Sequence, residues 1–128
     1  YGFDDGHYSA FRLIEIIGNM NENLSSIFGN LPKAFSTPEI NIEVEESQKF
    51  EIVNEFIKNA KFLEAKKIII DGLRVDFTDG WGLLRASNTT PKLVLRFEAK
   101  TSERLDEIQK LFLDQLKQID ESIEIKLS

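Results

Sequence analysis

Residues 85–91 combine one arginine with a run of small polar side chains between two apolar stretches. Arg85 stands where the first apolar stretch ends, and its planar guanidinium can donate two parallel hydrogen bonds to a phosphate or a carboxylate. Ser87 and Thr89 bring hydroxyl groups, and Asn88 brings a side-chain amide. A turn of small residues can also direct its backbone N–H groups toward an anion. The segment can therefore hold a phosphate without help from a metal ion.

The same segment also fits a simpler interpretation, as the polar loop of a β-hairpin. In that case Arg85 pairs across the strands with Glu98 or with another carboxylate. The chemistry of the residues alone favours this interpretation, because polar hairpin loops far outnumber phosphate sites. Taken by themselves, the residues leave both interpretations open.

The composition limits the classes of protein to which this chain can belong. With 128 residues, 41% of them hydrophobic, the chain can bury one core and form one compact domain with an appendage. Its formal net charge of −6 repels polyanions and disfavours nucleic-acid binding. It contains no cysteine, which suits a reducing compartment and makes the cytoplasm the expected location. No apolar run approaches the ~20 residues needed to cross a bilayer, so no membrane contact is expected.

The beginning of the chain has the pattern of two helices and a linker. The sequence Asp4-Asp5-Gly6 can cap a helix, because apolar residues then recur at helical spacing. Residues 21–30 allow a short second helix, after which two prolines prevent a third. We place a domain boundary there, so that residues 1–36 precede a domain of residues 37–128.

The second part of the chain reads mainly as β-strands. The strands expected from alternating or short continuous apolar runs are residues 40–44, 68–70, 73–77, 81–86 and 93–97. Asp71-Gly72 and Asp79-Gly80 separate the middle strands, and Asp-Gly is a strong signal for a two-residue hairpin turn. Residues 123–127 allow a short terminal strand.

Two amphipathic helices complete this part. Ser47 is the expected N-cap of the first helix, whose inward residues are Phe50, Val53, Phe56, Ile57 and Ala60. The second helix follows Ser102, and its inward residues are Leu105, Ile108, Phe112, Leu116 and Ile119. The order β-α-β-β-β-β-α predicts an α+β fold, with an antiparallel sheet of four to five strands and two helices packed on it.

Two other groups of residues could carry chemistry, but simpler interpretations are preferred for both. Asp4, Asp5 and His7 are close enough in sequence for a metal site, yet a helix-capping aspartate beside a surface histidine explains them. Trp81 could stack on a sugar ring, but a single tryptophan in an apolar strand is expected in the core. No metal ligand is assigned to this chain.

Three quoted stretches resemble one family. DGLRVDFTDGWGLLRASNTTPKLVLRFEA, residues 71–99, closely resembles the last domain of the α-D-phosphohexomutase superfamily, in its phosphomannomutase/phosphoglucomutase branch. YGFDDGHYSAFRLIEII, residues 1–17, resembles the end of that family's third domain. LPKAFSTPEINIEV, residues 31–44, resembles its linker into the fourth domain. Residues 1–36 are then the end of the third domain with its linker, and residues 37–128 the C-terminal phosphate-binding domain.

The motif Arg-x-Ser-Asn-Thr-x-Pro is the most specific part of the resemblance. In the family this loop binds the phosphate of the sugar, which implies that role for Arg85, Ser87, Asn88 and Thr89. Thr90 stands where many relatives have glutamate. Asn88 stands where phosphoglucosamine mutases typically have glycine, which favours the mannose/glucose branch.

The resemblance also implies a reaction. The family moves a phosphoryl group between the 1- and 6-positions of a hexose, through a phosphoserine enzyme and a bisphosphorylated intermediate. Its phosphoserine loop, magnesium loop and sugar-recognising segment would all lie before Tyr1. We therefore expect no catalytic residue in this chain, no activity of the chain alone, and Mg²⁺ bound elsewhere in the parent enzyme.

The expected partners follow from the same resemblance. They are mannose or glucose phosphates, hexose 1,6-bisphosphate and the upstream domains of the same polypeptide. The alternative function is that of an acidic α+β protein-interaction module with no phosphate site. In that case the polar loop is incidental.

Overall fold

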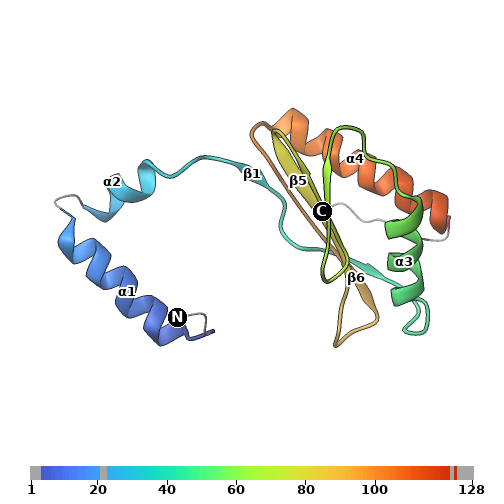
Figure 1. Cartoon of the computed structure of the whole chain (residues 1–128), viewed down its shortest axis with the longest axis horizontal. Coiled ribbons are helices and arrows are strands. Elements are labelled where there is room, and N and C mark those ends of the chain that lie inside the picture. The colour runs from blue at the N-terminus through green and yellow to red at the C-terminus, as the bar shows by residue number, and fades with distance from the viewer. Residues whose placement is uncertain (1–3, 21–22, 122, 124–128) are drawn as a thin grey trace. The chain divides into compact units, whose positions relative to one another are not determined.

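The chain forms two units, Tyr1–Lys33 and Ala34–Ser128 (Figure 1). The computed structural model describes residues 4–20, 23–121 and 123. The polar loop and the sheet that carries it belong to the second unit.

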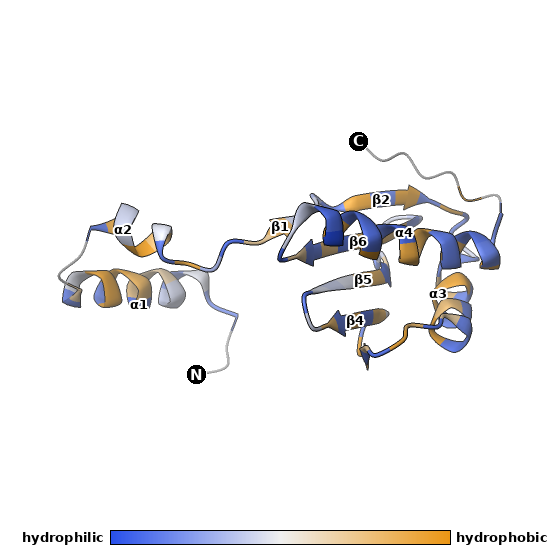
Figure 2. Ribbon diagram, turned by 90° about the horizontal axis from the view of Figure 1, so that it is seen from above, coloured by the Kyte–Doolittle hydropathy of each residue, from blue (hydrophilic) through white to orange (hydrophobic). Residues whose placement is uncertain are grey.

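Helices α1 (Gly6–Asn19) and α2 (Leu24–Gly29) make up the first unit. Each begins at a side chain, Asp5 or Asn23, whose Oδ1 accepts a hydrogen bond from the backbone N–H three residues later. None of the described residues in these two helices is buried, and most of the hydrophobic residues that colour α1 orange in Figure 2 are exposed. No helix in the described part of the chain is long and apolar enough to span a membrane.

The described residues of the second unit form one antiparallel sheet. Its strands are β1 (Phe35–Ser36), β2 (Ile40–Glu43), β3 (Lys66–Ile69), β4 (Leu73–Phe77), β5 (Gly80–Ala86) and β6 (Lys92–Ala99). The order is β1-β6-β5-β4-β3, with β2 also paired to β6. Phe35 pairs with Ala99 and Ile40 with Leu95, so the register along β6 shifts by one residue around Pro38. The two short segments thus act as one interrupted edge strand, and the sheet is five strands wide, within the predicted four to five.

Helices α3 (Lys49–Asn59) and α4 (Ser102–Ile119) cover one face of this sheet, which confirms the predicted α+β class (Figure 1). The core lies between the helices and that face. Phe112 of α4 is fully buried, with its ring centroid 5.2 Å from that of Phe97 on β6. Gly82 of β5 permits this approach, because a Cβ there would lie 2.5 Å from Phe112 Cε2.

Helix α3 begins later than predicted and is rotated about its axis. Its N-cap is Gln48 rather than Ser47, and no side chain caps it. Phe50, expected in the core, is 53% exposed, whereas Lys49 and Ile52 are buried. The buried residues follow the i, i+3, i+4, i+7 spacing from Lys49, so the inward stripe starts one residue before the predicted one.

The hairpin turns also differ from the Asp-Gly turns that the sequence predicts. Phe77 of β4 pairs with Gly80 of β5, so the two residues between them form the turn and Gly80 belongs to the strand. A Cβ at residue 80 would lie 2.5 Å from the Glu98 carbonyl oxygen, so the glycine permits close strand packing. The β3–β4 connection has three residues and ends at Gly72, whose φ of +100° favours glycine.

Two other strand predictions are shifted or lie outside the described residues. Strand β3 spans Lys66–Ile69 rather than residues 68–70, and Ile70 is exposed in the loop that follows. The terminal strand expected at residues 123–127 lies outside the described residues except for Ile123, which is buried.

A chain that begins at Ala34 is expected to unfold in one cooperative thermal transition, close to that of the whole chain. The sheet, both covering helices and the buried core residues all lie within Ala34–Ser128. Circular dichroism during heating measures the transition for both chains. A shortened chain that melts gradually would show that the first unit contributes to the fold of the second.

Candidate functional site

The polar segment forms the loop between β5 and β6. Ala86, the last residue of β5, pairs with Leu93 of β6. The Ser87 N–H donates to the Lys92 carbonyl oxygen at 2.9 Å, and the Lys92 N–H donates to the Thr90 carbonyl oxygen at 2.8 Å. The loop therefore stands at the end of two central, well-packed strands, which is a rigid support for a binding site.

Ser87 holds the loop together from within. Its nearly buried Oγ accepts hydrogen bonds from Thr90 Oγ1 at 2.8 Å, from the Thr90 N–H at 3.2 Å and, more weakly, from the Thr89 N–H at 3.4 Å. A serine that captures later backbone N–H groups in this way stabilises a tight turn. Two N–H groups of the expected anion-binding turn are therefore bonded to Ser87, and the loop is held by its own hydrogen bonds.

Asn88 and Thr89 are the exposed residues between these two fixed points. Within the described residues, the Asn88 amide and the Thr89 hydroxyl make no hydrogen bond to the protein. Because Ser87 and Thr90 fix the backbone on either side, both side chains are presented to solvent from a defined position. They are available to donate to a ligand.

Arg85 lies on the sheet face that the helices leave uncovered. Its Nη1 is 3.7 Å from Asp71 Oδ2, and the two side chains are 33% and 62% exposed. Of the two pairings expected for a plain hairpin, the one with Glu98 is wrong, because the strand register places Glu98 opposite Trp81 and Arg85 opposite Val94, and the one with another carboxylate is observed, with Asp71. An exposed pair at this distance contributes at most about 1 kcal/mol, so a doubly charged ligand can displace Asp71.

Lys49 is a residue of this site that the sequence analysis missed. Its side chain is 1% exposed, yet its Nζ donates to the Thr90 carbonyl oxygen at 3.2 Å and pairs with Glu46 Oε1 at 2.7 Å. One sequence feature could have indicated that it is buried: Lys49 stands at helical spacing from the apolar residues Ile52 and Val53. A charged residue at such a position is rarely buried unless it has partners.

Trp81, expected in the core, lies half-buried on the same uncovered face as Arg85. The Arg74 guanidinium is 4.1 Å from the Trp81 ring centroid, and Trp81 Nε1 donates to Glu98 Oε1 at 3.3 Å. Alternate residues of a strand face opposite sides. Because Gly82 and Leu84 face the helices, Trp81 and Arg85 face away from them.

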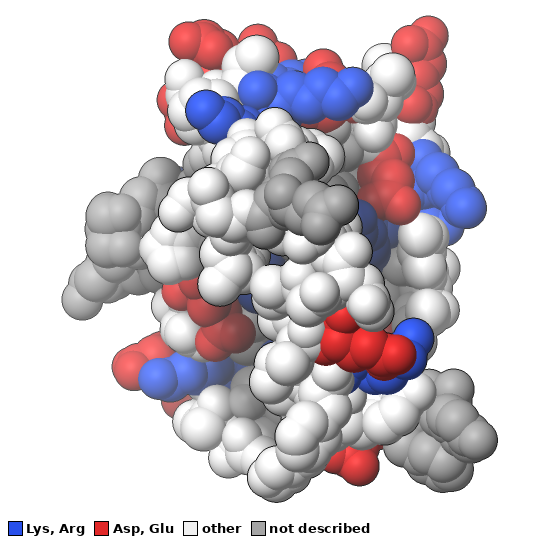
Figure 3. Space-filling model, turned by 90° about the vertical axis from the view of Figure 1, so that its left-hand side faces the viewer, with Lys and Arg blue, Asp and Glu red and all other residues white. Residues whose placement is uncertain are grey.

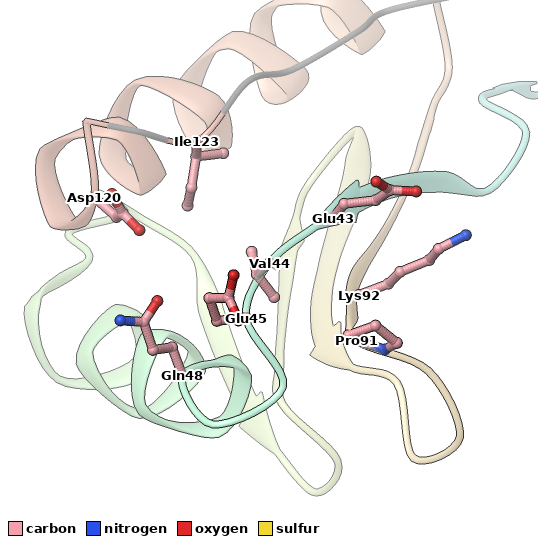
Figure 4. Close-up of a pocket in the computed structure, with 8 residues that line it drawn as sticks. All are labelled: Glu43, Val44, Glu45, Gln48, Pro91, Lys92, Asp120 and Ile123. Carbon is pink, nitrogen blue, oxygen red and sulfur yellow. The ribbon is translucent and has the colours of Figure 1, made fainter.

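A cavity of about 460 Å³ lies beside the loop, between the β2–α3 connection and the end of α4 (Figure 4). Its lining residues are Glu43, Val44, Glu45, Gln48, Pro91, Lys92, Asp120 and Ile123. Figure 4 shows Glu45, Gln48 and Asp120 around the hollow, while the Lys92 amine extends away from it. The carboxylates of Glu43, Glu45 and Asp120 make this cavity unsuited to a phosphate, whereas Arg85 lies on the sheet face that the helices leave uncovered.

The structure gives no support to a metal site at Asp4, Asp5 and His7. Asp5 is the N-cap of α1, and no group of three or more His, Asp or Glu among the described residues could hold a metal ion. On the face drawn in Figure 3, basic and acidic side chains are interspersed rather than gathered into a region of one sign.

The fold and the loop together define a class of domain: a two-layer α+β domain that presents an arginine and a polar turn at one end of its central hairpin. Residues 39–115 match the family profile described as phosphoglucomutase/phosphomannomutase, C-terminal domain. This match covers more than half of the chain. The chain therefore belongs to the phosphoglucomutase/phosphomannomutase family and corresponds to its C-terminal domain.

Individual relatives agree with this assignment. The chain is 49% identical over 125 residues to a phosphomannomutase/phosphoglucomutase of Pseudomonas aeruginosa, covering 98% of this chain and 27% of the relative. It is 52% identical over 114 residues to a phosphoglucomutase of Neisseria meningitidis, covering 88% of this chain and 25% of the relative. A crystal structure of a family protein from Burkholderia thailandensis superposes with a TM-score of 0.84 and 40% identity, covering 99% of this chain and 26% of that one. The chain thus spans about a quarter of the length of these relatives.

Proposed function

We propose that this chain is the substrate-phosphate-binding domain of a hexose-phosphate mutase that interconverts hexose 1-phosphates and 6-phosphates. The observation that carries the proposal is the β5–β6 loop, where Arg85 stands beside a polar turn held in place by Ser87. The names of the Pseudomonas and Neisseria relatives support mannose and glucose phosphates as the substrate class. We also keep the cytoplasm as the proposed location of the enzyme.

Each loop residue has a distinct proposed role. The Arg85 guanidinium donates two hydrogen bonds to the phosphate and offsets about half of its charge, since a phosphate monoester carries close to two negative charges at neutral pH. Asn88 and Thr89 donate from their exposed side chains. Ser87 shapes the turn, because its oxygen already accepts from Thr89 and Thr90.

This loop binds and orients, and the chemistry of the reaction belongs to other parts of the parent enzyme. Positioning and electrostatic stabilisation supply most of the catalysis in phosphoryl transfer, so a rigid phosphate site favours both steps of a mutase. Magnesium, which the family resemblance implies, would be held by residues outside this chain. The upstream domains of the same polypeptide are the proposed protein partners.

Titration of the isotope-labelled chain with glucose 1-phosphate, followed by ¹H–¹⁵N NMR, tests this proposal. We expect saturable shifts at the amides of residues 85–90, with similar affinity for mannose 1-phosphate, because both sugars present the same phosphate. Free glucose serves as the control and is expected to cause no such shifts. Absence of saturable shifts in the loop would contradict the proposal and favour the interaction-module alternative.

A further inference from the structure

Lys49 is a buried charged residue that contacts the loop but has no part in the phosphate binding proposed above. Moving an ammonium group out of water is unfavourable unless hydrogen bonds and an opposite charge compensate for it. Here the compensation comes from the Thr90 carbonyl oxygen at 3.2 Å and from Glu46 Oε1 at 2.7 Å. The Phe50 ring also lies near the amine, with its centroid 5.1 Å from Nζ.

The core does not require a charge at this position. Residue 49 stands on the same stripe of α3 as Ile52 and Phe56, which are buried against the sheet and α4. An apolar side chain of similar length would fill the space without the desolvation penalty, and it would leave no buried charge unpaired, because the Glu46 side chain is 66% exposed. The distinctive contribution of the lysine is therefore the contact of its amine with the loop, 41 residues away in sequence.

That contact completes the anchoring of Thr90. The Thr90 N–H and hydroxyl donate to Ser87 Oγ, while its carbonyl oxygen accepts from the Lys92 N–H and from Lys49 Nζ. Thr90 is thus fixed on one side to the loop itself and on the other to α3. Pro91, which follows it, further restricts the backbone.

We propose that Lys49 is a positioning residue for the phosphate-binding loop, an inference that rests on the proposed function. By holding the Thr90 peptide, it fixes the path of Asn88 and Thr89, so that they meet the phosphate without reorganisation. A binding site that is ordered beforehand loses less entropy when its ligand arrives. Because Glu46 pairs with the amine, we assign the effect to geometry rather than to long-range attraction.

The test compares Lys49→Met with Lys58→Met in the whole chain. Methionine keeps the length and apolar stem of lysine, and Lys58 is an exposed lysine of the same helix, 69% exposed and paired with Glu55. Both variants change the net charge equally. Thermal denaturation establishes that each is folded, and NMR titration with glucose 1-phosphate then gives the dissociation constant and the amide shifts of the loop.

We expect Lys49→Met to melt near the wild-type temperature but to shift the amide signals of residues 88–90 before ligand is added. Its dissociation constant for glucose 1-phosphate should rise about three- to tenfold, the range expected for one lost hydrogen bond. Lys58→Met should change neither the amide signals of the loop nor the dissociation constant. Lys49→Gln, which keeps a neutral donor one atom shorter, should bind with intermediate affinity, and it carries the test if the methionine variant does not fold.

The outcomes separate this inference from the proposed function. Wild-type protein that binds glucose 1-phosphate no more tightly than Lys49→Met or Lys49→Gln would overturn the role of Lys49 and leave the phosphate site intact. Wild-type protein with no saturable binding would overturn the proposed function and, with it, this inference. Equal losses in Lys49→Met and Lys58→Met would assign the effect to net charge and also overturn the positioning role.

Discussion

Phe112→Ala is expected to lower the free energy of unfolding by about 3–5 kcal/mol, the largest effect on stability that we predict for this chain. Phe112 is fully buried, and its ring centroid lies 4.8 Å from that of Phe62, 5.2 Å from Phe97 and 5.6 Å from Phe56. These rings come from a loop, a strand and a second helix. The space left by the ring cannot close easily, because the sheet backbone at Gly82 forms one of its walls.

Urea denaturation of the whole chain, followed by circular dichroism, measures this effect. Leu111→Ala is the matched control, because Leu111 is the preceding residue of α4 and is 42% exposed. We expect the control to lose less than about 1 kcal/mol, as is usual for partly exposed positions. Similar losses in the two variants would mean that the helix presents a different face to the sheet.

The elements with a regular apolar period could be predicted from the sequence. Helix α4 is an example, because its inward residues recur at 3.6-residue spacing over 18 residues, although it begins at Ser102, capped by Thr101, rather than after Ser102. The hairpin strands follow from the alternation in Leu73, Val75 and the residues after them. In both cases the local pattern and the tertiary packing agree, which is the condition for prediction from sequence.

The features that could not be predicted depend on contacts between distant residues. Lys49 is buried because of a carbonyl oxygen 41 residues away, so no local pattern identifies it. Trp81 lies outside the core because the helices cover the opposite face of β5. The alternation of side chains along a strand defines two faces but does not show which of them the helices cover. Gly80 belongs to a strand rather than a turn because of the neighbouring backbone at Glu98.

The candidate site likewise has features that the sequence predicts and features that only the structure shows. The sequence motif points to the loop and its candidate donors, since Arg85, Asn88 and Thr89 lie close together in the chain. The structure adds the anchoring of Thr90 by Ser87 and Lys49, and the neighbour of Arg85, which is Asp71 rather than Glu98. These contacts join segments whose register is set by strand pairing.

Arg85→Ala is expected to weaken binding of hexose phosphates more than any other single change in the loop. Arg85 is the charged donor that we place on the phosphate, and charge-assisted hydrogen bonds contribute about 1.5–3 kcal/mol each. The dissociation constant should therefore rise by roughly one to two powers of ten. Arg85→Lys should restore binding only in part, because an ammonium group keeps the charge but lacks the planar fork.

Titration calorimetry with glucose 1-phosphate and mannose 1-phosphate measures these affinities, and Arg74→Ala is the control. Arg74 lies on the same uncovered face but contacts Trp81 and Asp76 rather than the loop.

Asp71→Asn separates the two interpretations of Arg85, because it removes the carboxylate that competes with phosphate for the guanidinium. If Arg85 binds phosphate, Asp71→Asn should bind as tightly as the wild type or more tightly, while Arg85→Ala loses affinity for both sugars. If Arg85 is only the partner of Asp71 in a hairpin, neither substitution should change the affinity for either sugar phosphate. A loss of affinity confined to one sugar would mean that the loop contacts the ring hydroxyls rather than the phosphate.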